Sequence, residues 1–324
     1  MKLFVNKKFN RASVLNFITV VGGDILYKIL LFMITTGLVF AIISPIVGLV
    51  LRGFMHRQDM ANPLVYMIPV NFTTENFSLA IHFLKYWTTL ARTAGVSAVV
   101  VILQTLVCAC AGYGFARFNF PGRNILFALV IVTIVVPTQA IVTSLYMQFR
   151  FVDFLGLYPL VTGERGFSLL NTVWPLFILT AAGAGIRSGL FVFIFRQFFK
   201  NMPKELEESA FIDGANKFRT FYSIILPNAA PAIVTALIFT FVWQYNDVSY
   251  TTILLPNVEL MSNMIAAFGN NAFGSALLGG AQDPAWVGLL VQTGVVLVIA
   301  PLILVYLFLQ RAFIEGVERS GIVG

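Results

Sequence analysis

The chain has 324 residues, a length that would suggest about two domains in a soluble protein. The composition excludes that class, because 58% of the residues are hydrophobic and only 11% are charged. The net charge of +7 is not gathered in basic runs interleaved with aromatic residues, so a nucleic-acid partner is not expected.

Long apolar segments dominate the chain. A helix needs about 20 apolar residues to cross the hydrocarbon core of a bilayer. Windows that meet or approach this length are 29–51, 93–111, 125–148, 172–194, 229–254 and 287–309. The first window is too long for a cleavable signal peptide, and no small-residue cleavage site follows it. We therefore predict an all-α polytopic membrane protein with six transmembrane helices.

The distribution of lysine and arginine indicates the orientation. These residues gather before the first window, at 112–124, at 195–228 and after the last window, whereas the opposite loops hold fewer of them. The positive-inside rule then places both termini and the 195–228 loop in the cytoplasm. The predicted order is a cytoplasmic tail (1–28), a first transmembrane helix (29–51), an extracytoplasmic loop (52–88), a core with five transmembrane helices (89–309) and a cytoplasmic tail (310–324).

The cytoplasmic loop 195–228 has the signals of two short helices. Pro203 suits a first helical position, and acidic residues follow it where the helix dipole favours negative charge. Gly214 permits the left-handed conformation that ends a helix, and Pro227 precedes the fifth apolar window. From the spacing alone, this loop is either a compact docking knob or an amphipathic connector on the membrane surface.

A known signature lies in this loop. The pattern Glu208-Ser209-Ala210, Gly214 and Ile224-x-Leu226-Pro227 resembles the EAA signature of the inner-membrane permease subunits of ATP-binding-cassette importers, with Ser209 where alanine is usual. The flanking segments resemble the carbohydrate-uptake branch related to the maltose permease. These segments are Ala116-Arg117-Phe118, Pro121-Gly122-Arg123, Arg196–Phe199, Pro203–Glu208, Ile212–Ala215, Trp243–Asp247 and Gln310–Gly316.

The resemblance implies a six-span subunit in the cytoplasmic membrane of a bacterium or archaeon. It also implies four partners: a second homologous permease, two cytoplasmic ATPase subunits and an extracytoplasmic solute-binding protein. The chain contains no Gly-Lys dipeptide and hence no Walker A loop. We therefore expect no bound cofactor and no enzymatic activity in this chain, with ATP and Mg held by the ATPase.

The resemblance also implies that the loop is the ATPase coupling site. The residues expected there are Glu208, Ser209, Ala210, Asp213, Gly214, Ala215, Leu226 and Pro227.

Polar residues within the apolar windows are candidates for a translocation path, because they are costly in lipid and usually face an interior cavity. Gln139, Thr143 and Tyr146 recur at helical spacing in the third window. The fifth window becomes polar after Trp243, where the candidates are Gln244, Asn246 and Asp247. Hydrogen bonding between helices is an equal alternative for any one of these residues.

Arg187 lies inside the fourth window among Gly183, Gly185 and Gly189. It could pair with Asp247, act as a gate or touch the solute. Alternatively, the helix is shifted and the side chain extends to the cytoplasmic surface. No metal site is predicted, since the histidines lack suitably spaced companions and Cys108 and Cys110 point to different sides of a helix.

Two other functions stay open at this point. A permease for an amino acid, a peptide or a polyamine would share the EAA loop but should lack the flanks of the sugar branch. A secondary transporter or channel would need no ATPase, and the EAA spacing disfavours it.

Overall fold

The structure is a computed structural model that describes residues 11–60, 62–153, 157–163, 165–272 and 283–321. The start of the predicted N-terminal tail (1–10) and the end of the predicted C-terminal tail (322–324) lie outside the described residues. The chain divides into two compact units, Met1–Thr74 and Glu75–Gly324. Within the described residues the structure is helical, apart from two isolated β-bridges.

The first unit contains one long helix and a folded loop. Helix α1 (Arg11–Gly53) includes the predicted first transmembrane helix, and its apolar part is Gly23–Gly53. The short helix α2 (Arg57–Met60) follows. The carboxylate of Asp59 accepts hydrogen bonds from the backbone N–H groups of Val70 and Asn71 at 2.9 and 2.7 Å. The part of the predicted outer loop that follows α1 is therefore ordered by its own polar contacts.

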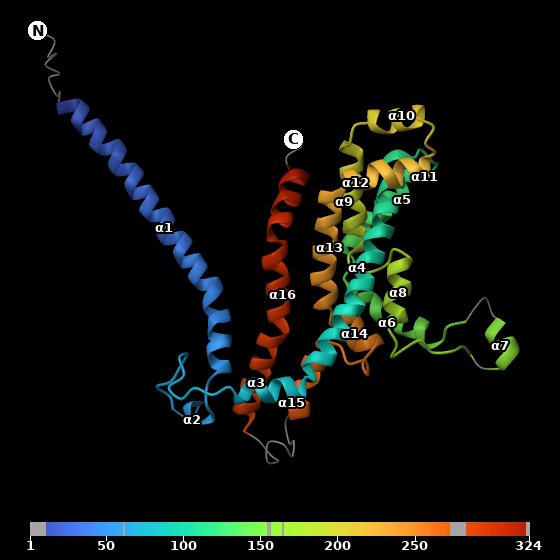
Figure 1. Cartoon of the computed structure of the whole chain (residues 1–324). Coiled ribbons are helices and arrows are strands. Elements are labelled where there is room, and N and C mark those ends of the chain that lie inside the picture. Colours follow the sequence, from blue (N-terminus) through green and yellow to red (C-terminus); the bar gives the residue numbers. More distant parts are fainter. Residues whose placement is uncertain (1–10, 61, 154–156, 164, 273–282, 322–324) are drawn as a thin grey trace, which may run out of the picture. The chain divides into compact units, whose positions relative to one another are not determined.

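The second unit begins with α3 and ends with the long helix α16 (Figure 1). Its helices are α3 (Glu75–Phe83), α4 (Tyr86–Arg117), α5 (Arg123–Val135), α6 (Thr138–Arg150), α7 (Leu157–Thr162), α8 (Trp174–Ala181), α9 (Ser188–Asn201), α10 (Glu205–Ile212), α11 (Lys217–Thr220), η1 (a π-helix, Phe221–Ile225), α12 (Leu226–Asn228), α13 (Ala230–Tyr245), α14 (Ser249–Leu254), α15 (Met261–Ala272) and α16 (Pro284–Gly321).

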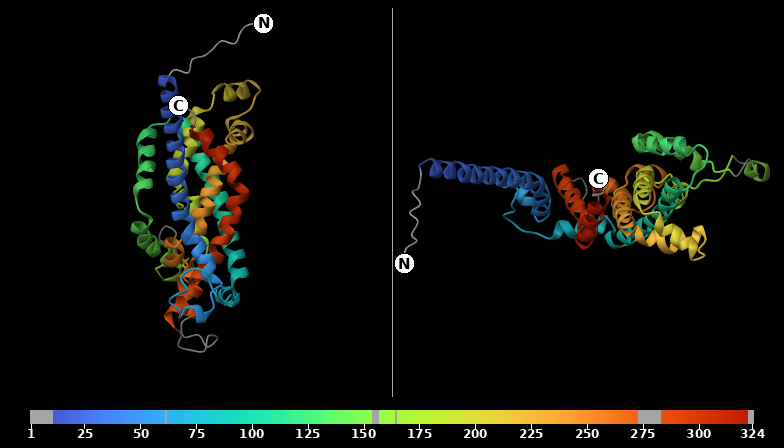
Figure 2. Two further views of the ribbon diagram at one scale, coloured as in Figure 1. Left: turned by 90° about the vertical axis from the view of Figure 1, so that its left-hand side faces the viewer. Right: turned by 90° about the horizontal axis from the view of Figure 1, so that it is seen from above.

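Three described helices are long and apolar enough to cross a membrane: Gly23–Gly53, Tyr86–Arg117 and Pro284–Gln310. Two bent pairs qualify if each is one span: α5 with α6, bent by 102°, and the 217–228 segment with α13, bent by 75°. The left view of Figure 2 shows the turn from α5 to α6. The described residues thus have three to five apolar spans, which confirms a polytopic helical protein and leaves the number six as a prediction.

The fourth apolar window, 172–194, is not one continuous helix. It is divided between α8 and α9, and the chain between them has Gly183 at φ +73° and Arg187 at φ +54°. A left-handed residue cannot continue a right-handed helix. The glycine-rich stretch between Ala181 and Ser188 therefore interrupts the helix, although most of the segment is apolar.

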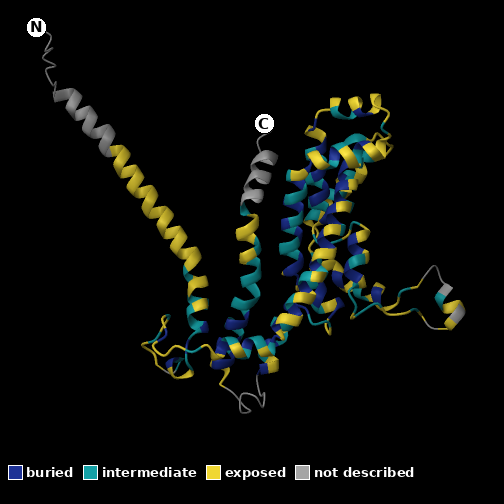
Figure 3. Ribbon diagram, in the orientation of Figure 1, coloured by how far each residue is buried: buried dark blue, intermediate teal, exposed yellow. Residues whose placement is uncertain are grey.

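Helix α4 is the centre of the second unit. It packs against α8, α9 and α13, and the buried side chains concentrate on these helices (Figure 3). At the closest contact, a Cβ atom on Gly112 would lie 2.5 Å from the Cβ atom of Phe195, so only glycine allows α4 and α9 to approach this closely. The buried core at this crossing includes Cys108, Tyr113, Phe191, Phe195 and Phe199.

Candidate functional site

The loop that carries the EAA pattern consists of two short helices on either side of Gly214. Helix α10 ends at Ile212, and Gly214 has φ +81°, in agreement with the helix break expected from the sequence. Helix α11 then begins after Asn216, whose side-chain oxygen accepts a hydrogen bond from the backbone N–H of Arg219 at 2.8 Å. The turn is thus defined by one glycine conformation and one N-cap.

The motif residues differ in exposure. Glu208, Ser209, Asp213, Gly214 and Pro227 are exposed. Ala215 and Leu226 are partly buried, whereas Ala210 is buried against the unit. Helix α10 therefore presents its acidic side outward, as Figure 3 shows by its mostly exposed surface. The role of these residues in coupling stays a prediction.

Exposed apolar side chains accompany the motif. Ile212, Phe218 and Tyr222 are 86%, 77% and 66% exposed. Strongly exposed apolar side chains outside the apolar windows are typical of a protein contact surface. Phe218 and Tyr222 could not be assigned to a surface from the sequence, because an aromatic residue in a helical loop is equally compatible with burial.

A buried ion pair joins α10 to α4. Nε of Arg117 lies 2.8 Å from Oε1 of Glu207, and the two side chains are only 7% and 13% exposed. The two atoms form an ion pair without the alignment of a hydrogen bond. Nη2 of Arg117 also donates a hydrogen bond of 2.7 Å to the carbonyl of Met202, next to the end of α9. Arg117 therefore ties the start of the loop to the central helix.

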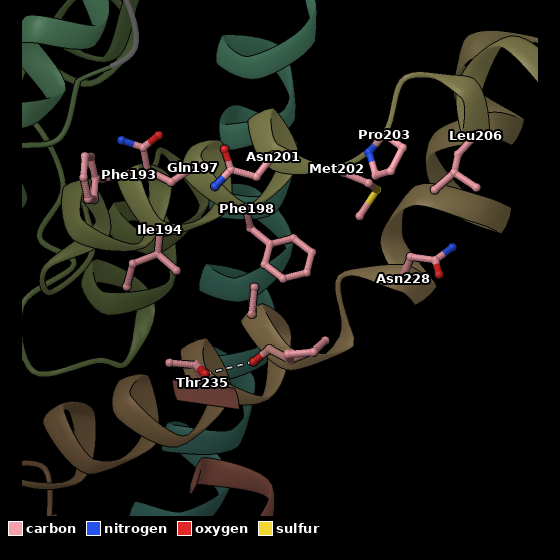
Figure 4. A pocket seen from close by; sticks show the side chains of 12 residues that line it. Phe193, Ile194, Gln197, Phe198, Asn201, Met202, Pro203, Leu206, Asn228 and Thr235 are labelled. Carbon is pink, nitrogen blue, oxygen red and sulfur yellow. Dashed lines mark hydrogen bonds between the residues drawn. The ribbon is translucent and has the colours of Figure 1, made fainter. Parts of the chain in front are cut away.

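A largely apolar cavity of about 570 Å³ lies behind α10 (Figure 4). Its walls come from the end of α9, the segment leading to Leu206 and the start of α13. At its base, the Thr235 hydroxyl donates a hydrogen bond to the carbonyl of Pro231, within α13. Beside this space, Leu206 packs against the buried core and Ala210 is buried, so these side chains and the Arg117–Glu207 pair help to attach α10 to the unit.

The polar stripe predicted for the third window lies on α6. Gln139 and Thr143 are exposed, and Tyr146 is partly buried. Nε2 of Gln139 donates a long hydrogen bond of 3.4 Å to the Ser249 hydroxyl. The Tyr146 hydroxyl accepts a hydrogen bond from Arg150 at 3.1 Å. The stripe thus reaches the break between α13 and α14.

Asp247 caps α14. Its carboxylate accepts backbone hydrogen bonds from Ser249, Tyr250 and Thr251 at 3.1 to 3.3 Å. Gln244 is also buried, whereas Asn246 is exposed and donates from its side chain to the carbonyl of Val242. The candidates in the fifth window therefore have different environments, and the Asp247 carboxylate is occupied by the backbone.

Arg187 lies at the break between α8 and α9. Its side chain is exposed, and its Cζ lies 4.8 Å from the centre of the Trp243 ring. None of the ion pairs among the described residues includes Arg187, so the pairing with Asp247 considered above is not formed.

Sequence reasoning missed the residue that holds this break. Gln104 on α4 is 1% exposed, and its Nε2 donates a hydrogen bond of 2.7 Å to the carbonyl of Ile186. One turn later, Sγ of Cys108 is 3.6 Å from the carbonyl of Ser188. The signal in the sequence was Gln104 itself, because an amide side chain in the largely apolar window 93–111 needs a hydrogen-bond partner.

An ion-pair cluster fixes the loop between α14 and α15. Glu259 pairs with Lys85, and with Arg92 at 3.1 Å. The backbone N–H of Met261 donates a hydrogen bond to the Thr93 hydroxyl at 2.9 Å. Hydrogen bonds from Lys85 and then Arg92 hold the pKa of the Glu259 carboxyl below its ordinary value. This loop is therefore fastened to the start of α4.

Comparison with known families identifies the class of protein. Residues 107–319, which include the EAA loop, α13 and most of α16, match the family described as "Binding-protein-dependent transport system inner membrane component". The chain belongs to this family. It is accordingly a multi-pass membrane permease subunit rather than an enzyme, as the resemblance in the sequence implied, and its family works in general with ATPase and solute-binding partners.

Curated relatives agree with this assignment over most of the chain. The arabinooligosaccharides transport system permease protein AraQ of Halalkalibacterium halodurans is 26% identical over 308 residues, which cover 91% of this chain and 98% of AraQ. The maltodextrin transport system permease protein MalD of Streptococcus pneumoniae is 25% identical over 287 residues, which cover 88% and 91%.

A solved structure has the same fold. It belongs to a bacterial ABC transporter involved in the import of the acidic polysaccharide alginate. The alignment has a TM-score of 0.67 at 17% identity and covers 90% of this chain and 98% of the matched chain.

Proposed function

We propose that this chain is the membrane-spanning subunit of an ATP-driven, binding-protein-dependent importer of sugars, most specifically of oligosaccharides. The observation that supports the sugar class best is the set of relatives aligned over most of the chain, whose names specify arabinooligosaccharides, maltodextrin, trehalose and alpha-glucosides. The flanks of the EAA pattern in this sequence agree with that class.

In the proposed complex, this six-span subunit pairs with a second, homologous permease. Two cytoplasmic ATPase subunits bind ATP and Mg, and an extracytoplasmic binding protein delivers the solute. Both termini and the 195–228 loop lie in the cytoplasm, in line with the positive-inside distribution of lysine and arginine.

The exposed side of α10 is the proposed contact with the ATPase. It combines the carboxylates of Glu208 and Asp213 with the apolar side chain of Ile212, so it offers both charge and apolar area to a partner. The ion pair between Arg117 and Glu207 supports transmission, because a displacement of α10 pulls directly on α4. In turn, α4 packs against α9 and α13, which lead to the candidate translocation residues.

Co-purification from native membranes tests this assembly. Affinity-tagged chain, solubilised in mild detergent, is expected to retain a second permease and two copies of an ATPase, measured by native mass spectrometry. Charge reversal in Glu208→Lys should release the ATPase while the second permease remains, because Glu208 is exposed on α10. Recovery of a chain without any ATPase would contradict the proposal.

A further inference from the structure

The Arg187 side chain occupies an unusual place in the second unit. Arg187 has φ +54°, a left-handed backbone conformation that is strained in a residue other than glycine. It also carries a charge within an apolar window, where arginine is expensive and usually faces a cavity or a partner. Both costs fall on one residue, which indicates that the guanidinium has a function.

The backbone on both sides of Arg187 is held by α4. Gln104 binds the carbonyl of Ile186, and Cys108 contacts the carbonyl of Ser188. The guanidinium instead lies over the ring of Trp243 on α13, with Cζ 4.8 Å from the ring centre. Trp243 itself stacks on Phe239 and contacts Phe191, so the ring has a fixed position. A cation–π contact of this kind attracts the guanidinium to the face of the ring.

The N–H groups of the Arg187 guanidinium meet no acceptor in the part of the chain that the structure describes. Among the described residues, Arg187 takes part in no ion pair and donates no side-chain hydrogen bond. Asp247, the acid one helical turn beyond Trp243, is committed to the backbone of α14. The exposed side chain of Asn246 lies between these two residues in the chain. Arg187 is therefore an exposed arginine near the end of α13 that has no counter-charge among the described residues.

We infer that Arg187 binds a carboxylate of the solute, so that the imported oligosaccharide contains uronic acid units. A planar guanidinium binds a carboxylate through two parallel hydrogen bonds, and the contact with the Trp243 ring uses none of its N–H groups as a donor to a described acceptor. This inference rests on the proposed function and narrows its substrate class from oligosaccharides to acidic oligosaccharides.

Uptake of one oligouronide in two forms tests the inference. The complete complex with its binding protein, in proteoliposomes that contain ATP, is given the free acid or its neutral methyl ester. The wild type should take up the acid at least ten-fold faster than the ester. Arg187→Gln should abolish that preference, so that acid and ester enter at equal rates, and Arg187→Lys should keep part of it. Arg52→Gln is the matched control, since Arg52 also stacks on an exposed aromatic ring, that of Tyr66.

Each of the following results would overturn the inference. One is an equal rate for acid and ester in the wild type, and another is an unchanged preference in Arg187→Gln. The third is an equal loss of uptake of every substrate in Arg187→Gln, together with loss of the second permease from the complex. That result would make Arg187 an ion-pair partner within the complex. Uptake of neutral sugars alone would remove the inference and leave the proposed function intact, whereas absence of any ATP-driven sugar uptake would remove both.

Discussion

Replacing Gly214 by valine is expected to lower solute uptake at least ten-fold while ATP hydrolysis by the assembled complex continues. Gly214 has φ +81°, a conformation that a β-branched residue adopts only at a cost of about 1–3 kcal/mol. Apart from Gly214 and its two chain neighbours, no described atom lies within 4 Å of the Cβ position, so the cost comes from the backbone conformation. The strain should change the orientation of α10 relative to α11 and so uncouple ATP hydrolysis from solute transport. Uptake and ATPase rates in the same proteoliposomes measure this effect.

Gly122→Val is the matched control for this experiment. Gly122 has nearly the same backbone conformation, φ +80°, and equally open surroundings, but it lies at the turn between α4 and α5. Gly122→Val should lower the melting temperature about as much as Gly214→Val does, because the backbone strain is similar. It should nevertheless retain coupled transport. Equal coupling in the two variants would mean that the conformation at Gly214 has no special part in transmission.

We expect the second large effect, on stability and transport, from breaking the ion pair between Arg117 and Glu207. Removing one partner of a buried ion pair costs about 3–5 kcal/mol, because the other charge stays buried without compensation. Both side chains are almost fully covered, so Arg117→Met and Glu207→Met should each lower the melting temperature of the purified subunit and free α10 from α4. Transport should fall with them, since α10 would then move without α4.

A double-mutant cycle separates the pair from other effects. If the pair acts as a unit, the double variant Arg117→Met/Glu207→Met should be more stable than the sum of the single losses predicts, by at least 1 kcal/mol. Glu208→Gln, a change at the exposed neighbour, should leave the melting temperature unchanged. Additive losses in the cycle would show that the two charges do not stabilise each other.

Much of the fold follows from the sequence because its signals are local. The apolar windows at 93–111 and 287–309 predict α4 and α16, since a continuous apolar run needs no knowledge of its neighbours. The end of α10 could be predicted for the same reason, because Gly214 determines the helix end through its own conformation.

The remaining features depend on contacts between distant segments. The break between α8 and α9 is held by Gln104, which lies more than 80 residues before it in the chain. Arg117 and Glu207 are similarly distant, so the sequence could present Arg117 only as part of a basic turn. Asp247 differs because its partner is local. From the sequence its carboxylate is a candidate for the translocation path, but it accepts a hydrogen bond from the backbone N–H of Tyr250, three residues later.

Solute uptake into proteoliposomes tests the central claim most directly. The complete complex is reconstituted with ATP inside, and the binding protein and a labelled oligosaccharide are added outside. We predict accumulation against the concentration gradient with hydrolysable ATP, and none with a non-hydrolysable analogue or without the ATPase subunits. Accumulation by this chain without ATPase subunits, driven by an ion gradient, would contradict the account.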